Sequence, residues 1–383
     1  MRRTADVVII GGGILGASTA YHLARKGCRK VVLLEQAQFF GTGSTGQNAG
    51  GIRHQFSTAV NIELSRLSIA MLERFGEEME QEVDINFCGY LFLLDNQADA
   101  ASFRRNIALQ RSLGVEAEWL SPADIAAREP RINLEGIVGG TFYGRDGIAD
   151  PNSALQGYVQ QARRLGATLL TDSAVTEIRV ASGQVIGVTT PAGEIDTATV
   201  VIAAGPWSGE VGRLAGIELP VQPIRRQIAV TGPIPGITRQ FPFTIDFSRG
   251  LYFHHETGGI LTGMSNHDQA PGFDIGLDPE WRLHHIENAI FRLPLLEQAE
   301  IMSEWAGLYE VTPDDQPILG RLPQVEGLIS CTGFSGHGFM HGPAAGLLTA
   351  EEIVDGGAHT INIDDLRWAR FDSGVAAEEL NII

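Results

Sequence analysis

Three glycines near the N-terminus have the spacing of a phosphate-binding turn. Gly11, Gly13 and Gly16 follow a predicted buried strand, residues 6–10, and open a segment of helical character, residues 14–26. We expect Gly11 to allow a sharp turn, Gly13 to let backbone approach a pyrophosphate, and Gly16 to let helix and strand touch. Free N–H groups and the helix dipole favour an anion at the helix start. The pattern predicts a dinucleotide site.

An acidic residue at the end of the next apolar run narrows the choice of dinucleotide. Glu35 follows residues 31–34 and lies nineteen positions beyond Gly16 (35 − 16). A carboxylate there can accept a hydrogen bond from a ribose 2′-hydroxyl, and it repels the 2′-phosphate of NADP. The neighbouring Gln36 is not the arginine that would offset this repulsion. FAD and NAD remain as alternatives.

Two later segments are too rich in glycine and polar residues for core elements. The first, residues 41–54, is a long loop of the kind that is more often functional than accidental, although a flexible linker is the alternative. The second, residues 333–342, follows an apolar strand at 328–332. We predict a helix over residues 343–354, because Pro343 suits a first helical turn.

The order of the elements predicts the fold class. Strand and helix alternate in the first 35 residues, and the apolar run 200–202 ends abruptly in small residues, as in a strand of a parallel sheet. From 227 to 309 the chain changes to β-runs broken by proline and glycine, which predicts an antiparallel sheet. We predict an α/β fold in which a Rossmann-like FAD-binding domain carries an inserted antiparallel-sheet substrate domain. The expected boundaries are 1–88, 140–225 and 310–383 for the first domain, and 89–139 and 226–309 for the second.

Composition excludes several classes of protein. The 383 residues carry a formal net charge of −18, which disfavours binding to nucleic acid. Cys28, Cys88 and Cys331 show no metal-ligand spacing and are expected to be buried thiols in a reducing compartment. No apolar stretch is long enough for a transmembrane helix, so the cytoplasm is the expected location.

At this point the sequence resembles the flavin-dependent amine oxidoreductases of the D-amino-acid-oxidase and sarcosine-oxidase type. The resemblance covers nearly the whole chain, and within the family it is nearest to the β subunits of L-proline dehydrogenases and heteromeric sarcosine oxidases. It rests on residues 11–35, 44–53, 305–309 with 312–314, and 333–339.

The resemblance implies FAD, and no second glycine motif offers a nicotinamide site. The helix near Pro343 would aim its N-terminus at the flavin pyrimidine and stabilise negative charge there. The residues implied in cofactor binding are Gly11, Gly13, Ile14, Leu15, Gly16, Glu35, Gln36, Ser44, Thr45, Gln47, Gly50, Gly51, Ile52, Val175, Ala203, Ala204, Gly205, Trp207, Gly307, Gly333, Gly336, His337, Gly338, Phe339 and Met340.

Four departures from the family pattern matter. Gly307 stands where single-subunit sarcosine oxidases carry the cysteine that links FAD, so FAD is expected to be non-covalent. Met340 replaces a lysine that binds substrate carboxylate. A lysine credited with activating oxygen has no counterpart between Tyr252 and Gly263, which favours a dehydrogenase over an oxidase. The histidine that holds a covalent FMN is missing near residues 144–150.

Four residues are candidates for contact with the substrate. Arg53 could grip a carboxylate through two parallel hydrogen bonds, with a surface salt bridge as the alternative. Tyr252 and His267, expected on neighbouring strands, resemble the family's substrate-facing pair, although both could be structural. His337 could contact flavin or substrate. His337 and His341 are not expected to bind a metal, because no carboxylate cluster joins them.

The sequence therefore predicts oxidation of a secondary amino acid resembling proline or sarcosine. A hydride would pass to flavin N5, leaving an imine that is hydrolysed, and a partner subunit or a quinone would accept the electrons. The alternatives are a glycine or D-amino-acid oxidase that produces hydrogen peroxide, and a flavin-holding electron-transfer subunit of a larger complex.

Overall fold

The glycine turn belongs to a six-stranded sheet. The computed structural model describes residues 3–373 and 378–382. The strand order is β10-β3-β2-β14-β21-β20, and all neighbours are parallel except β20 and β21. The strands are β10 (Thr168–Leu170), β3 (Val31–Leu34), β2 (Val7–Ile10), β14 (Val200–Ile202), β21 (Leu328–Thr332) and β20 (Ile318–Arg321). Their continuous apolar runs suit strands that are covered on both faces.

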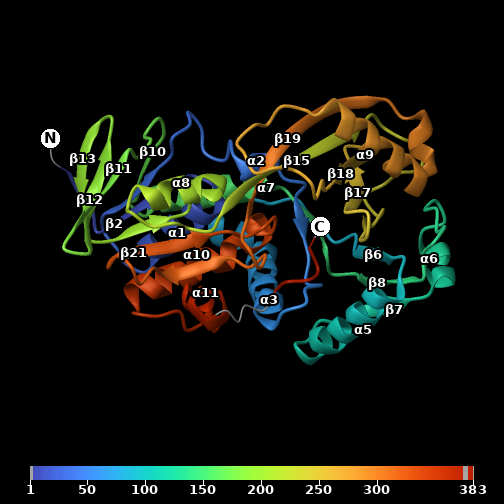
Figure 1. Cartoon of the computed structure of the whole chain (residues 1–383), viewed down its shortest axis with the longest axis horizontal. Helices are drawn as coiled ribbons and strands as arrows, with labels where there is room; N and C mark the ends of the chain where they lie inside the picture. The colour runs from blue at the N-terminus through green and yellow to red at the C-terminus, as the bar shows by residue number, and fades with distance from the viewer. Residues whose placement is uncertain (1–2, 374–377, 383) are drawn as a thin grey trace.

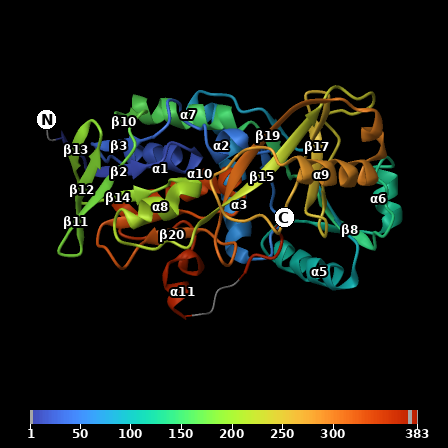
Figure 2. The same cartoon turned by 45° about the horizontal axis from the view of Figure 1, so that its top comes forward.

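Alternate residues of β2 show what covers each face. Val7 and Ile9 pack into a core with α1 (Ile14–Arg25), α7 (Pro151–Arg164) and α10 (Gly338–Val354). Val8 and Ile10 pack toward α8 (Ser208–Arg213) and a small sheet of order β1-β13-β12-β11. Figure 1 shows this small sheet at one end of the molecule, and Figure 2 shows α7 and α8 on opposite sides of α1.

Helix α10 packs closely against α1 and α3 (Ala59–Glu73). A Cβ atom on Gly346 would lie 2.2 Å from Oγ of Ser18 on α1. The expectation that this helix starts at Pro343 is wrong, because it begins at Gly338 and includes the proline. The chain tolerates it there at the loss of one backbone hydrogen bond, and the carbonyl of Pro343 accepts a hydrogen bond from Ser18.

A second, eight-stranded sheet lies at the other end of the molecule (Figure 1). Its order is β19-β15-β18-β17-β16-β6-β8-β7, and neighbours are antiparallel except β16 and β6, which are parallel. The strands are β19 (Ile301–Val311), β15 (Gln222–Thr231), β18 (Gly259–Met264), β17 (Leu251–Glu256), β16 (Phe243–Asp246), β6 (Tyr90–Leu94), β8 (Gly139–Tyr143) and β7 (Glu118–Leu120). These strands come from two separate parts of the chain, as the prediction of an inserted domain requires. The domain boundaries stay a prediction.

The remaining elements connect and cover the two sheets. The helices are α2 (Ser44–Gln47), α4 (Phe75–Met79), α5 (Gln97–Ser112), α6 (Pro122–Arg128), α9 (Pro279–Arg292), α11 (Ala369–Ser373) and the 3-10 turns η1 (Gly205–Trp207), η2 (Pro294–Gln298) and η3 (Asp364–Leu366). The strands are β1 (Arg3–Thr4), β4 (Gly51–Ile52), β5 (Ile85–Asn86), β9 (Gly147–Ala149), β11 (Glu177–Ala181), β12 (Gln184–Thr190) and β13 (Gly193–Asp196).

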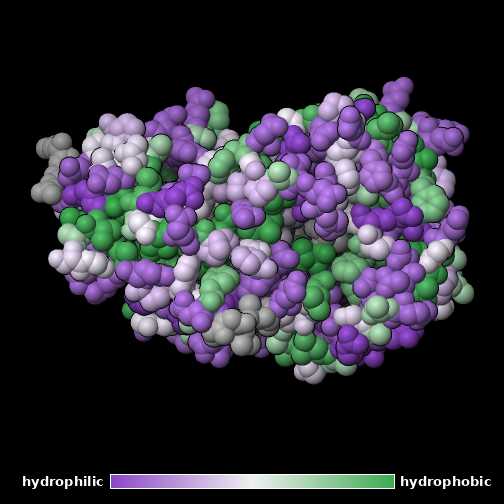
Figure 3. All heavy atoms as spheres, in the orientation of Figure 1, coloured by the Kyte–Doolittle hydropathy of each residue, from purple (hydrophilic) through white to green (hydrophobic). Residues whose placement is uncertain are grey.

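The surface is largely hydrophilic on the face shown in Figure 3, with hydrophobic residues scattered over it. Within the described residues, no helix is both long and apolar enough to cross a membrane. The three cysteines are free thiols. Cys331 is buried, but Cys28 and Cys88 are partly exposed, so the prediction that all three are buried is wrong.

The contact between α1 and α10 gives a test of the fold. Gly346→Ala should lower the free energy of unfolding by ~1–3 kcal/mol, because overpacking against Ser18 outweighs the better helix propensity of alanine. Urea denaturation measures the effect. Gly357→Ala is the matched control, since a Cβ there would meet no atom within 4 Å. Equal stability of the two variants would contradict the close packing.

Candidate active site

A cavity of about 640 Å³ connects the two sheets. Its lining begins at the glycine turn after β2 and extends to β15, β17 and β19 of the second sheet. The residues predicted to bind the cofactor all line this cavity except Gly16, Gly50, Ile52 and Gly333. Of the four predicted catalytic residues, Arg53, Tyr252 and His337 line it, and His267 does not.

Two of the glycines outside the lining serve the packing around it. A Cβ atom on Gly16 would lie 2.0 Å from the carbonyl oxygen of Gly11, so only glycine lets α1 follow the turn so closely. Gly50 has a φ of +71°, and a Cβ atom there would lie 2.7 Å from the carbonyl oxygen of Ala149. These two glycines do not line the cavity, but their lack of a side chain lets the backbone segments beside it pack closely.

The glycine-turn end of the cavity fits the diphosphate of a dinucleotide. Gly11 has a φ of +114°, and a Cβ atom there would lie 2.2 Å from the carbonyl oxygen of Ala203. Gly13 is the N-cap of α1 and has no side chain that could cap the helix. The amide of Ile14 donates to Oγ1 of Thr45, 3.1 Å away. The remaining N–H groups of the first turn, together with the helix dipole, are therefore available to an anion.

Glu35 is held in a fixed position beside this turn. Its Oε2 accepts a hydrogen bond from the amide of Gly12 at 2.7 Å, and its Oε1 accepts one from the amide of Ala37 at 2.8 Å. A carboxylate has about four acceptor positions, so capacity remains for ribose hydroxyls. The backbone fixes the carboxylate at the cavity wall, and its hydrogen bond to a ribose hydroxyl stays a prediction.

A second helix start, that of α10, lies farther along the cavity. Gly338, Phe339 and Met340 form its first turn and line the cavity. Glu310 lies beside it, where its Oε2 accepts hydrogen bonds from Oγ1 of Thr332 at 2.7 Å and from the amide of Gly333 at 3.0 Å. Burial raises the pKa of Glu310, and these hydrogen bonds oppose the rise.

The guanidinium of Arg53 is buried and bound to the protein itself. Its Nη1 donates to the carbonyl of Gln55 at 2.5 Å, and its Nη2 donates to the carbonyl of Asn381 at 2.6 Å. Nη2 also lies 3.2 Å from Nε2 of His337. The Arg53 group sits over the ring of Phe56, 3.9 Å from its centroid. Both hydrogens on Nη2 are therefore engaged.

The contact with Arg53 determines the protonation of His337. A guanidinium can only donate, so Nε2 of His337 must accept and the ring proton lies on Nδ1. Burial, followed by the charges of Arg53 and of His341, holds the pKa of His337 well below its usual value. His337 is neutral at ordinary pH.

Three phenols and one further cation complete the second-sheet end of the cavity. Tyr90, Tyr252 and Tyr309 line it, and their hydroxyls have no hydrogen-bond partner among the described residues. Burial raises the pKa of each phenol, so all three stay protonated and can donate. The guanidinium of Arg226 lies 5.1 Å from the centroid of the Tyr309 ring. This end of the cavity therefore carries positive charge and has hydroxyl groups without hydrogen-bond partners among the described residues.

His267 does not form the predicted pair with Tyr252. Strand β18 ends at Met264, and His267 lies in the turn beyond it, exposed and outside the cavity lining. The prediction of neighbouring strands is wrong at this position because the chain leaves the sheet three residues earlier. Tyr252 lies on β17 with its hydroxyl close to Gly263, where a Cβ atom would come within 2.3 Å of it.

Several lining residues were not predicted. Tyr90 and Tyr309 lie within segments that the sequence singled out, but as parts of a strand and a motif rather than as site residues. Glu310 and Arg226 were missed. A signal existed for Arg226, since two adjacent arginines lie directly before the predicted β-run that begins at residue 227, and successive side chains of a strand face opposite sides. Within the described part of the chain, no group of three or more His, Cys, Asp or Glu is arranged to hold a metal ion.

The fold and the cavity define a dinucleotide-binding α/β protein with a second sheet over the far end of the cofactor site. Comparison with known proteins specifies the class. The model of the FAD dependent oxidoreductase family matches residues 6–352. The chain belongs to this family, and its cofactor is FAD.

Two relatives and two solved structures illustrate the similarity. FAD-dependent oxidoreductase domain-containing protein 1 of Xenopus laevis is 33% identical over 99% of this chain and 85% of its own length. Mouse mitochondrial sarcosine dehydrogenase is 32% identical over 92% of this chain, which spans only 40% of that protein. The structure of L-proline dehydrogenase from P. horikoshii has a TM-score of 0.90 at 30% identity, covering 98% of this chain and 100% of that one. Glycine oxidase from Geobacillus kaustophilus has a TM-score of 0.84 at 25% identity, covering 96% and 99%.

Gly13 offers a test of the cofactor site that spares the fold. Its backbone is extended, and a Cβ atom there would meet only Oγ1 of Thr45, at 3.0 Å. Gly13→Val should fold but fill space at the helix start, raising the Kd for FAD by about tenfold or more, or ~1.4 kcal/mol. Flavin fluorescence titration of the apoprotein measures the Kd. Unchanged affinity, equal to that of Gly357→Ala, would show that FAD does not approach this turn.

Proposed function

We propose that the protein is an FAD-dependent dehydrogenase that oxidises a small amino acid with a secondary amine, such as proline or sarcosine. The observation that carries this proposal is the charge at the second-sheet end of the cavity. Arg53 and Arg226 both line it, and neither forms an ion pair with a carboxylate of the described residues. A cationic, partly enclosed site without a counter-ion favours an anionic ligand.

The relatives support the choice of amine. Proteins similar to this chain include a sarcosine dehydrogenase and an L-proline dehydrogenase. Both of these substrates are amino acids whose nitrogen carries two carbon substituents. Glycine oxidase, another similar structure, acts by its name on a primary amino acid, and an oxidase of that type is the alternative within the same class.

FAD, when bound, supplies the acceptor for the hydrogen and electrons removed from the substrate. The chain supplies binding and orientation. Tyr252 and Tyr309 present neutral hydroxyls that can hydrogen-bond to a carboxylate or an amine. His337 stays neutral and holds Arg53 in place. Gly307 lines the cavity without a side chain that could link to FAD, so we propose that FAD binds non-covalently.

The distribution of lysine supports a dehydrogenase over an oxidase. The whole chain contains two lysines, Lys26 and Lys30. Lys26 pairs with Asp355, and Lys30 donates to Thr4, and none of these residues lines the cavity. No lysine is therefore available to activate oxygen beside the flavin. We propose a partner subunit or a quinone as the electron acceptor, in the cytoplasm.

Anaerobic mixing tests the function directly. L-Proline or sarcosine should bleach the flavin absorbance of the FAD-loaded protein, whereas pyrrolidine, which lacks the carboxylate, should not at the same concentration. Glycine and D-alanine test the oxidase alternative. Admitting air afterwards should restore the absorbance only slowly.

The outcomes separate the alternatives. Bleaching by glycine or D-alanine alone, followed by rapid reoxidation in air, would contradict the dehydrogenase proposal. If no amino acid bleaches the flavin, the catalytic assignment fails and an electron-transfer subunit becomes the better account.

A further inference from the structure

We propose that Arg226, together with the hydroxyls of Tyr252 and Tyr309, is the group that binds the substrate carboxylate, and that Arg53 acts behind it as a positioning residue. This inference rests on the proposed function, because it assigns the carboxylate of that substrate to one side chain.

The hydrogen bonds of Arg226 leave Nη2 of its guanidinium free for a ligand. Nη1 donates to the carbonyl of Arg225 at 3.1 Å and lies 3.5 Å from that of Asn266. Nε is buried and shielded from the cavity, whereas Nη2 has no hydrogen-bond partner among the described residues. Nη2 can therefore donate a charge-assisted hydrogen bond to a carboxylate in the cavity. The protonated hydroxyls of Tyr252 and Tyr309 can donate to the same carboxylate.

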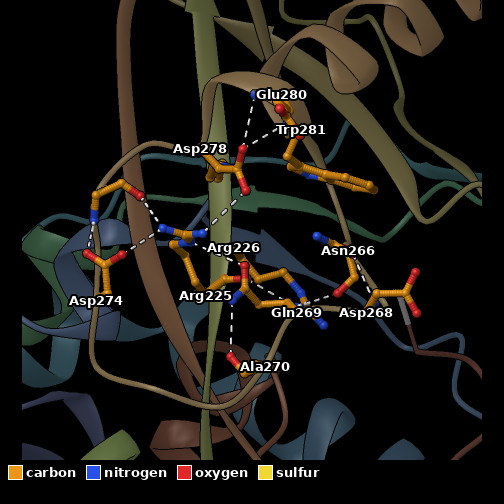
Figure 4. A network of polar contacts seen from close by, with 12 residues as sticks. Arg225, Arg226, Asn266, Asp268, Gln269, Ala270, Asp274, Asp278, Glu280 and Trp281 are labelled. Atoms are coloured by element: carbon orange, nitrogen blue, oxygen red, sulfur yellow. Dashed lines mark hydrogen bonds and ion pairs between the residues drawn. The ribbon is translucent and has the colours of Figure 1, made fainter.

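The neighbouring residue explains why Arg226 has no counter-ion. Successive side chains of a strand point to opposite faces, so Arg225 and Arg226 diverge on β15. Arg225 forms ion pairs with two acids of the segment after β18, Asp274 at 3.0 Å and Asp278 at 3.6 Å. Figure 4 shows Arg225 between these two carboxylates and Arg226 directed away from them. Strand β15 therefore carries two adjacent arginines, and of the two only Arg225 forms ion pairs among the described residues.

The acid that acts electrostatically on Arg226 does not form an ion pair with it. Asp315 exerts a favourable electrostatic effect on Arg226, but no ion pair joins them. Burial, followed by the charge of Glu378, raises the pKa of Asp315 to about 6, so its carboxylate loses its charge only in mildly acidic solution. The positive charge of Arg226 is therefore available to a ligand.

Arg53 is less suited to grip the carboxylate. Both hydrogens of its Nη2 are used by the carbonyl of Asn381 and by His337, so the matching edge of its guanidinium is closed. The contact with Asn381 also ties Arg53 to the segment 378–382. In that segment, Glu379 accepts hydrogen bonds from the amides of Ser57 at 2.7 Å and Thr58 at 3.1 Å. Arg53 therefore fixes the cavity wall at the start of α3.

Arg226→Gln in the FAD-loaded protein is the decisive variant. It should raise the KM for the amino acid on the order of 100-fold while leaving the flavin content and oxidised spectrum unchanged. Arg226→Lys keeps the charge but lacks the guanidinium that places Nη2 in the cavity, and should give a smaller loss. Arg282→Gln, which removes the same charge from the exposed surface of α9, is the matched control and should leave KM unchanged.

Binding of cyclopentanecarboxylate provides a readout that does not depend on turnover. This compound has the shape of proline without an oxidisable amine, and isothermal titration calorimetry measures its Kd. Wild type and Arg282→Gln should bind it, and Arg226→Gln should bind it on the order of 100-fold more weakly.

The failures of the two proposals differ. If wild type oxidises an amino acid and Arg226→Gln retains wild-type KM and Kd, the assignment of Arg226 is wrong while the function stands. The same holds if only Arg53→Gln abolishes binding while Arg226→Gln does not. If wild type neither binds cyclopentanecarboxylate nor is reduced by any amino acid, the proposed function itself fails. Should Arg226→Gln not fold, Arg226→Lys decides, and wild-type KM and Kd in that variant would overturn the assignment of the carboxylate to the guanidinium of Arg226.

Discussion

The close approach of α1 and α10 is the constraint on which the cavity depends. Gly346 lies against Ser18, and a Cβ atom on Gly342 would come within 2.8 Å of Ile14, at the first turn of α1. Two helices from opposite ends of the chain therefore begin beside each other at one cavity. Their first turns provide two places where backbone N–H groups and the helix dipole favour negative charge. A larger side chain at these glycines would move one start away from the other.

The second sheet completes the site through its distribution of charge. Arg225 and Arg226 are adjacent in sequence, yet Arg225 forms ion pairs with acids of the loop after β18, whereas Arg226 faces the cavity and forms no ion pair among the described residues. Arg53, by contrast, is bound by carbonyls and a neutral histidine. The site thus contains one arginine, Arg53, whose Nη2 donates only to groups of the protein, and a second, Arg226, whose Nη2 can donate to a ligand. The hydroxyls of the neighbouring tyrosines have no hydrogen-bond partner among the described residues, so they too can donate to a ligand.

The sequence predicted the parts of the structure that local rules control. The spacing of Gly11, Gly13 and Gly16, with Glu35 after the next strand, specified the turn because each of these positions has a backbone reason for its residue. The family resemblance identified FAD, and most of the residues that it implied line the cavity. The change after residue 227 to β-runs broken by proline and glycine indicated the second sheet.

What escaped prediction depends on contacts between distant segments. The parallel pairing of β16 with β6 joins residues about 150 positions apart and leaves no local signal. The early start of α10 depends on its packing against α1, and the exposure of His267 depends on where β18 ends. The partners of Arg53 include Asn381, 328 residues away, so its closed edge could not be read from its own neighbourhood.

The most direct measurement is a crystal structure of the FAD-loaded protein with cyclopentanecarboxylate. The account predicts the carboxylate within hydrogen-bond distance of the guanidinium of Arg226 and of at least one of the hydroxyls of Tyr252 and Tyr309, with Arg53 still bound to Asn381 and His337. A carboxylate held by Arg53 alone, or bound outside the cavity between the two sheets, would contradict it.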